Sequence, residues 1–125
     1  MEIEEILQLV REEMKKIPEH DIYFRLKQYK VKRFREPTVR ILQCAIALQR
    51  LGLPVTTGFL VNVLHLPYES VLGICHALGD KHVLILKRQG TKAHVWVVHP
   101  AFMRWFEEHV SDSEKEVHEV EERNG

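Results

Sequence analysis

Residues 51–98 read LGLPVTTGFLVNVLHLPYESVLGICHALGDKHVLILKRQGTKAHVWVV and hold the strongest structural signals in this 125-residue chain. Either Thr56 or Thr57 can cap a short helix over residues 58–65. The leucine-proline pair that follows breaks this helix, and a second helix is expected over residues 68–78. The apolar residues of the second helix recur at the i, i+3, i+4, i+7 spacing of one buried face: Val71, Ile74, Cys75 and Leu78. The sequence therefore predicts two helices joined by a tight turn.

A β-hairpin is expected after these two helices. Residues 83–86 and 93–98 are apolar and rich in β-branched side chains, which favour strands. Between them lies the polar, glycine-containing stretch Lys87-Arg88-Gln89-Gly90-Thr91-Lys92. The pattern predicts two strands joined by a basic tip.

A longer helix is predicted upstream, from Glu36 to Gly52. The proline at position 37 suits the first turn of a helix, and Gly52 is a typical stop signal. The inner face is predicted from apolar residues at helical spacing: Ile41, Cys44, Ala45, Leu48 and Leu51. The opposite face is more polar and consists of Arg40, Gln43, Ala47 and Arg50. We expect this helix to have one buried and one exposed face.

The segment before this helix is predicted to be helical. Its first part has a narrow apolar seam that ends at Pro18 and consists of Ile3, Leu7, Val10, Met14 and Ile17. Two interpretations of the seam remain open, because it can pack on its own domain or form a dimer interface. Residues 21–35 fit either a helix or a strand, and we favour the helix.

A last amphipathic helix is expected after the hairpin, from the apolar residues Phe102, Met103, Trp105, Phe106 and Val110. From Ser111 onward the chain is acidic and has few large apolar residues, so we expect a disordered tail. We divide the chain into residues 1–35, an amphipathic helix and a basic segment; residues 36–110, a mostly helical domain with a β-hairpin; and residues 111–125, the acidic tail.

The formal net charge is zero, with 18 basic and 18 acidic side chains, which argues against a strongly basic nucleic-acid binder. The charges are nevertheless clustered. Residues 25–40 have seven basic side chains and one acidic one, residues 81–106 have five basic and no acidic ones, and both ends are acidic. The block 25–40 either extends a binding surface or is a solvated face. We expect the acidic tail to compete with nucleic acid for the basic side chains.

Several function classes are not indicated. We find no phosphate-binding glycine loop, no His-Glu-x-x-His, no serine elbow and no paired cysteines, so no enzyme and no cofactor is expected. Cys44 and Cys75 lie far apart in apolar helical patterns and are interpreted as buried free thiols. A metal sensor around Cys75, His76 and His82 lacks the ligand spacing of known zinc sites. With no long apolar run and no secretory signal at the start of the sequence, we expect a cytoplasmic protein without membrane contact.

From Pro37 to Val98, about half of the chain, the order of helix, helix, tight turn, helix and basic hairpin resembles the winged helix-turn-helix family. The third helix of that family has the pattern Val-x-x-apolar-apolar-x-x-Leu, which is matched here by Val71, Ile74, Cys75 and Leu78. His82 departs from the family, which often has a glycine in a left-handed conformation at this point. The resemblance implies a mostly α fold with a small β-hairpin wing, extended here by extra N- and C-terminal helices.

The resemblance also implies a way of binding DNA. In the docking usual for the family, the helix over residues 68–78 enters the major groove and the wing contacts phosphates. The DNA-binding residues expected on this basis are Thr57, Tyr68, Ser70, His76, Lys87, Arg88, Gln89 and Lys92. The helix departs from a typical operator reader, because its outward side chains include no Arg, Lys, Asn or Gln for bidentate base contacts. Exposed Tyr68 and Leu72 suit a thymine methyl group or a partner protein equally well.

The sequence thus leads us to expect a winged-helix protein that binds double-stranded DNA and regulates transcription. A homodimer is expected, formed through the N-terminal helix, the C-terminal helix or both, because two-fold operators match two-fold proteins. The alternative is a winged-helix protein-interaction module in a larger replication or transcription assembly.

Overall fold

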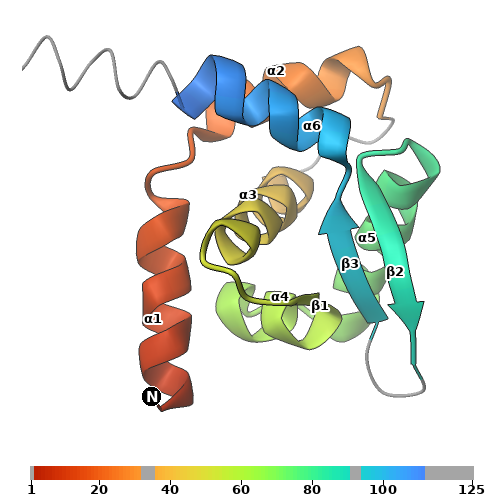
Figure 1. The fold of residues 1–125 in the computed structure, drawn as a ribbon. Coiled ribbons are helices and arrows are strands. Elements are labelled where there is room, and N and C mark those ends of the chain that lie inside the picture. The colour runs from red at the N-terminus through yellow and green to blue at the C-terminus, as the bar shows by residue number, and fades with distance from the viewer. Residues whose placement is uncertain (1, 32–35, 91–93, 112–125) are drawn as a thin grey trace, which may run out of the picture.

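The computed structural model describes residues 2–31, 36–90 and 94–111. In chain order the elements are α1 (Ile3–Met14), α2 (Glu19–Gln28), α3 (Glu36–Arg50), β1 (Val55–Thr56), α4 (Thr57–Leu64), α5 (Tyr68–Asp80), β2 (Leu84–Gln89), β3 (His94–Val98), α6 (Pro100–Trp105) and the π-helix η1 (Phe106–Ser111) (Figure 1). The fold is mostly helical with a small antiparallel sheet, as predicted. The predictions for Lys92 and for the tail after Ser111 lie outside the described residues. Among the described helices, none is long and apolar enough to cross a membrane.

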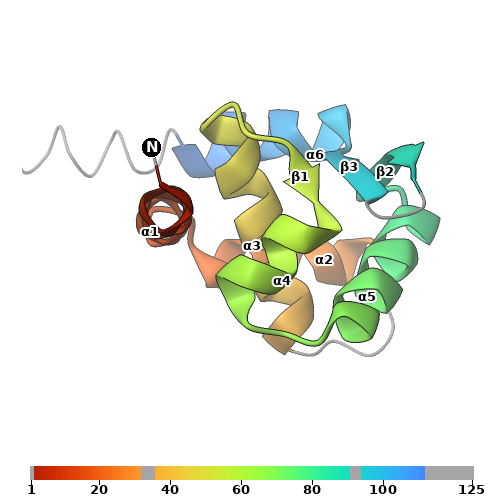
Figure 2. The same ribbon diagram turned by 90° about the horizontal axis from the view of Figure 1, so that it is seen from below.

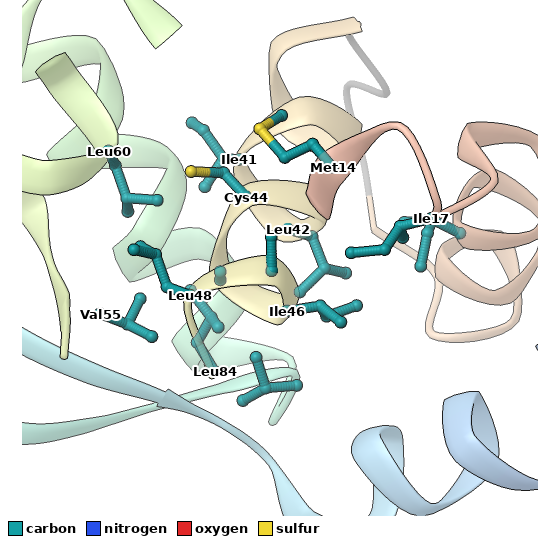
Figure 3. Packing of buried hydrophobic residues seen from close by; sticks show 14 of the residues in the cluster. Met14, Ile17, Ile41, Leu42, Cys44, Ile46, Leu48, Val55, Leu60 and Leu84 are labelled. Atoms are coloured by element: carbon teal, nitrogen blue, oxygen red, sulfur yellow. The ribbon is translucent and has the colours of Figure 1, made fainter. Parts of the chain in front are cut away.

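α3 is the central helix of the fold. Ten of its 15 residues are buried, and α1, α2, α4, α5 and β3 all contact it. Figure 3 shows Met14 and Ile17 on one side of α3 and side chains from α4, β1 and β2 on the other. The prediction of an exposed face with Gln43 and Ala47 is wrong, because both residues are buried. The end of α1 and the turn after it cover the side of α3 that contains Gln43.

Gln43 joins α3 to the end of α1. Its side-chain Nε2 donates hydrogen bonds to the backbone oxygens of Met14, at 3.0 Å, and Ile17, at 2.7 Å. Both oxygens lie at or just after the C-terminal end of α1, where backbone carbonyl groups have no partner within the helix. Arg50 adds a second link between the two helices, since its Nε lies 3.3 Å from Oε1 of Glu13. The polar side chains of α3 therefore hold α1 in place.

The apolar seam of α1 packs on its own chain. Leu7, Val10, Met14 and Ile17 are buried in a core cluster that continues to Val110 near the end of the described residues. The first interpretation of the seam is thus confirmed for these four residues. Ile3, the remaining member, is 60% exposed.

α2 (Glu19–Gln28) confirms that a helix forms in the segment 21–35, where a helix was favoured over a strand, but it begins and ends earlier than expected. It ends at Gln28, and Lys30 has a φ of +56°, in the left-handed region, where a right-handed helix cannot continue. The Arg25 guanidinium lies over the rings of Tyr29 and Trp105, 5.6 Å and 5.2 Å from their centroids. These cation–π contacts link α2 to α6.

α6 and η1 form the predicted last helix, which ends in a π-helical turn. Phe102 and Phe106 are fully buried in the core of the chain itself. Trp105 is half-buried and packs edge-on against Phe102, with ring centroids 5.2 Å apart. The aromatic cluster is therefore part of the core.

α4 and α5 confirm the predicted pair of helices around a tight turn. Thr56 is the N-cap of α4, since its Oγ1 accepts a hydrogen bond of 3.0 Å from the backbone N–H of Phe59. α4 ends at Leu64, its C-cap His65 has a φ of +56°, and α5 begins directly after Pro67. Figure 2 shows α4 and α5 side by side, with α1 seen end-on next to α4.

The sheet is antiparallel, with the strand order β1-β3-β2. β1 was not predicted, because its two residues are too few to show the alternation that marks a strand. His82, just before β2, has a φ of +59°, which is the left-handed conformation that the family resemblance implies at this position. α3, α4, α5, β2 and β3 follow one another in the predicted order of helix, helix, tight turn, helix and hairpin. α1 and α2 precede this set, and α6 and η1 follow it.

Candidate nucleic-acid interface

α5 presents three of the predicted contact residues to solvent. Its inner face is anchored in the core by Val71, Cys75 and Leu78, which are all buried. The helical period therefore turns Ser70 and His76 outward, whereas Tyr68 shares the face of Val71 and Cys75 and is exposed at the first position of the helix. Tyr68 is 43% exposed, which leaves much of its ring and its hydroxyl group accessible. These three side chains can exchange hydrogen bonds with bases or phosphates.

The charges of α5 itself do not favour a polyanion. The helix has Glu69 in its first turn and Asp80 at its end, and its sequence contains no lysine or arginine. The N-terminus of a helix attracts anions through its dipole, but the carboxylate of Glu69 opposes this attraction. Positive charge at this interface must therefore come from neighbouring elements.

β2 supplies this positive charge. It pairs Leu86 with Trp96 and Arg88 with Val95, so Lys87 is an extra residue, a β-bulge. The bulge interrupts the alternation of the strand, and Lys87, Arg88 and Gln89 are all exposed. The prediction that these three residues form a loop at the tip of the wing is wrong, because the strand continues through Gln89. The cations lie on a paired strand that packs beside α5.

Three aromatic rings connect α5 to the wing. The ring of His76 lies edge-on to Trp96, with centroids 5.1 Å apart, and edge-on to His94, with centroids 5.7 Å apart. His94 and Trp96, both from β3, are stacked at 6.3 Å. An exposed residue of the helix thus contacts a buried residue of the wing, and this contact fixes the helix relative to the strand.

Thr57 does not belong to the exposed interface. It is fully buried, and its Oγ1 accepts a hydrogen bond of 3.2 Å from Nε1–H of Trp96. The same hydroxyl group donates a 3.5 Å hydrogen bond to the backbone oxygen of His94. The prediction that Thr57 contacts DNA is therefore wrong. Its hydroxyl group instead joins the start of α4 to β3.

Sequence reasoning did not single out His94 and Trp96. A usable signal was the spacing of His94, Trp96 and Val98, which places all three on one face of a strand. An indole on the inner face requires a hydrogen-bond acceptor, and in the structure this acceptor is the hydroxyl group of Thr57.

The cysteines do not add a reactive site. Burial raises the pKa of the Cys44 thiol and of the Cys75 thiol to about 12, so both are protonated at neutral pH. Across the described residues, no three side chains of the metal-ligating types come together as a metal site requires.

No protein-family model matches this sequence. A search of curated proteins also finds no match.

Proposed function

We propose that this protein binds double-stranded DNA through the exposed side of α5 and the wing strand β2. The observation that supports this most directly is the pair of exposed cations, Lys87 and Arg88, on a strand packed beside α5. In this proposal the wing contacts phosphates and α5 lies in the major groove. α5 has 13 residues and is about 20 Å long, enough to follow the groove.

The base sequence is read weakly in this proposal. Tyr68, Ser70 and His76 each offer single hydrogen bonds, and α5 has no Arg, Lys, Asn or Gln for a bidentate contact with a base. Phosphate contacts then supply most of the affinity, so binding falls steeply with salt. The biological role that we propose is transcription regulation in the cytoplasm.

We further propose a homodimer, which would present two copies of α5 to a two-fold DNA site. Ile3 and Leu9 of α1 support this, because they are 60% and 43% exposed although both are large and apolar. Light scattering on the purified protein is expected to give twice the mass of the chain. The Ile3→Glu/Leu9→Glu variant is expected to be monomeric, and an equal mass for both proteins would exclude this interface.

The test of DNA binding is fluorescence anisotropy with a random-sequence duplex over a salt series. The Lys87→Ala/Arg88→Ala variant is expected to bind at least about tenfold more weakly, with a salt slope reduced by up to about 2. The control is Lys15→Ala/Lys16→Ala, which removes the same charge from the turn directly after α1, and α1 lies on the opposite side of the molecule from the wing (Figure 1). Equal losses in the two variants would show that only net charge matters and would contradict the proposed interface.

A protein-interaction module is the second candidate. It is favoured by the exposed side of α5, where Tyr68 lies among residues without positive charge and Leu72 is half-buried. Absence of DNA binding even at low salt would decide for this candidate. Binding to a partner would then depend on Tyr68 and Leu72 and would tolerate the loss of Lys87 and Arg88.

A further inference from the structure

A cleft lies on the α1 side of the fold, away from the wing. It has a volume of about 600 Å³ and is lined by the second half of α1, the start of α2, the first half of α3 and the end of α4. Figure 2 shows α1 and α4 next to each other at this place. The volume is in the range of small-molecule sites, which is about 300–1,000 Å³.

The walls of the cleft are rich in cationic side chains. Arg11, Lys15 and Arg40 line it together with His65, whereas Glu19 is the one acidic side chain among its lining residues. Three cations against one carboxylate in the lining give the cleft a positive charge, which attracts an anion. The cleft therefore has the electrostatics of an anion site.

Two of the cations already have partners in the protein. Arg11 Nε and Nη2 donate to the backbone oxygens of Val63 and Asn62, both at 3.4 Å. Lys15 Nζ lies 3.1 Å from Oε1 of Glu12. These bonds hold Arg11 against the C-terminal end of α4 and leave Lys15 near the rim.

Arg40 is different. It is half-buried, and among the residues that the structure describes no hydrogen bond or ion pair holds its guanidinium. A guanidinium has five N–H donors in a planar fork that matches carboxylate and phosphate oxygens. A partly buried arginine with these donors unused is well placed to bind an anion from solution.

The other lining residues indicate the chemistry of the part of the ligand that does not carry the charge. Met14, Ile17, Val63 and Leu64 line the cleft together with Arg40, but each is at most 9% exposed, so they offer a narrow apolar surface. Gln43, also in the lining, is fixed by its hydrogen bonds to Met14 and Ile17. A bare inorganic ion would leave this apolar surface uncovered, whereas a ring or short chain would cover it.

We propose that this cleft binds a small organic anion, with a carboxylate or phosphate group on Arg40 and an apolar body against Met14 and Leu64. Lys15 adds positive charge at the rim. His65 lines the cleft and is also the C-cap of α4, so the site touches the turn that leads to α5. The proposal does not rest on DNA binding.

The test is a titration of ¹⁵N-labelled full-length protein, followed by two-dimensional NMR, with benzoate, phenyl phosphate and the neutral benzamide. We expect saturable shifts of amides around Arg11, Gln43 and His65 with at least one of the two anions and none with benzamide. Tighter binding of phenyl phosphate would identify a phosphate site, and tighter binding of benzoate a carboxylate site. Saturable shifts with benzamide of the same size, or none with either anion, would refute the proposal.

Variants of Arg40 provide the second part of the test. Arg40→Gln is expected to weaken anion binding about tenfold or more, and Arg40→Lys to weaken it less, because the charge stays while the planar fork is lost. Arg104→Gln is the matched control, since Arg104 is exposed on α6 outside the cleft. If Arg40→Gln does not fold, Arg40→Lys and Lys15→Gln decide the matter, and unchanged affinity in both would overturn the proposal.

Discussion

The imidazole of His76 in α5 stands edge-on to the indole of Trp96 in β3, with centroids 5.1 Å apart and ring planes 80° apart. Trp96 is buried, whereas His76 is exposed. The indole N–H of Trp96 donates a hydrogen bond to Oγ1 of Thr57, at the start of α4. Trp96 thus connects α4, α5 and the wing through its side chain.

Thr57→Val is expected to reduce the free energy of unfolding by about 1–3 kcal/mol, because the buried indole N–H loses its acceptor while the shape of the side chain is kept. Urea denaturation followed by circular dichroism measures the change. In the Trp96→Phe background the N–H is absent, so the same substitution should cost about 1 kcal/mol less. Additive effects of the two changes would mean that the hydrogen bond contributes nothing.

Gln43→Leu is expected to destabilise the fold by about 1–3 kcal/mol, since the backbone oxygens of Met14 and Ile17 lose the amide donor in a buried place and Met14 O keeps its bond from Ile17 N–H. Urea denaturation of the variant gives this value directly. Gln8→Ala is the control, because Gln8 is exposed and its side chain bonds only to exposed Glu12, and its effect should stay within about 0.5 kcal/mol. A Gln43→Leu protein as stable as the original would mean that water replaces the amide.

His82→Gly is expected to stabilise the protein by about 0.5–1 kcal/mol. His82 is exposed and has a φ of +59°, a conformation that costs an L-residue about 1–2 kcal/mol and costs glycine little. Greater freedom of the unfolded chain offsets part of the gain. Ala77→Gly, at an exposed position within α5, should instead destabilise the protein by about 0.5–1 kcal/mol. Thermal denaturation of both variants checks the sign, and a loss of stability in His82→Gly would contradict the argument.

Because the two cysteines are buried, we expect the free energy of unfolding to fall at alkaline pH. Burial raises the pKa of both thiols to about 12 from an ordinary value near 9.0, so the folded state holds their protons more tightly than the unfolded state. Their contribution to stability is complete below about pH 9 and is lost as the pH rises from there toward 12. Urea midpoints between pH 8 and pH 10.5 should therefore fall.

The control for this effect is Cys75→Ala, whose midpoint should decline less over the same pH range. A disulfide reagent added to the folded protein at pH 8 should find no reactive thiol, and two should react after urea is added. Reaction of either thiol in the folded protein would contradict the burial of these side chains.

The helices and strands that have strong local signals were predictable. Pro67 marks the break between α4 and α5, and the β-branched residues before and after the wing mark its strands. In these places the local preference of the chain agrees with its final structure. The exposed positions of Ser70 and His76 followed from the helical period of α5, whereas Tyr68 is exposed because it is the first residue of the helix.

The errors have a common cause in polar groups that are satisfied by distant parts of the chain. Gln43 was assigned to an exposed face because it is polar, but its partners are backbone oxygens 29 and 26 residues earlier. Thr57 was assigned to the DNA surface, but its partners lie 37 and 39 residues later. Periodicity describes neighbours within one element, so it cannot reveal a hydrogen bond between two elements.

The position of α1 also bears on the order in which the chain acquires its structure during synthesis. Its apolar stripe is made before α3 and α4, and the carbonyl groups to which Arg11 donates belong to residues 51 and 52 positions further on. A free helix of 12 residues is barely stable in water. On the ribosome, α1 therefore emerges without a partner and docks only after α3 and α4 have left the exit tunnel. A segment that is synthesised early is then among the last to pack onto the fold.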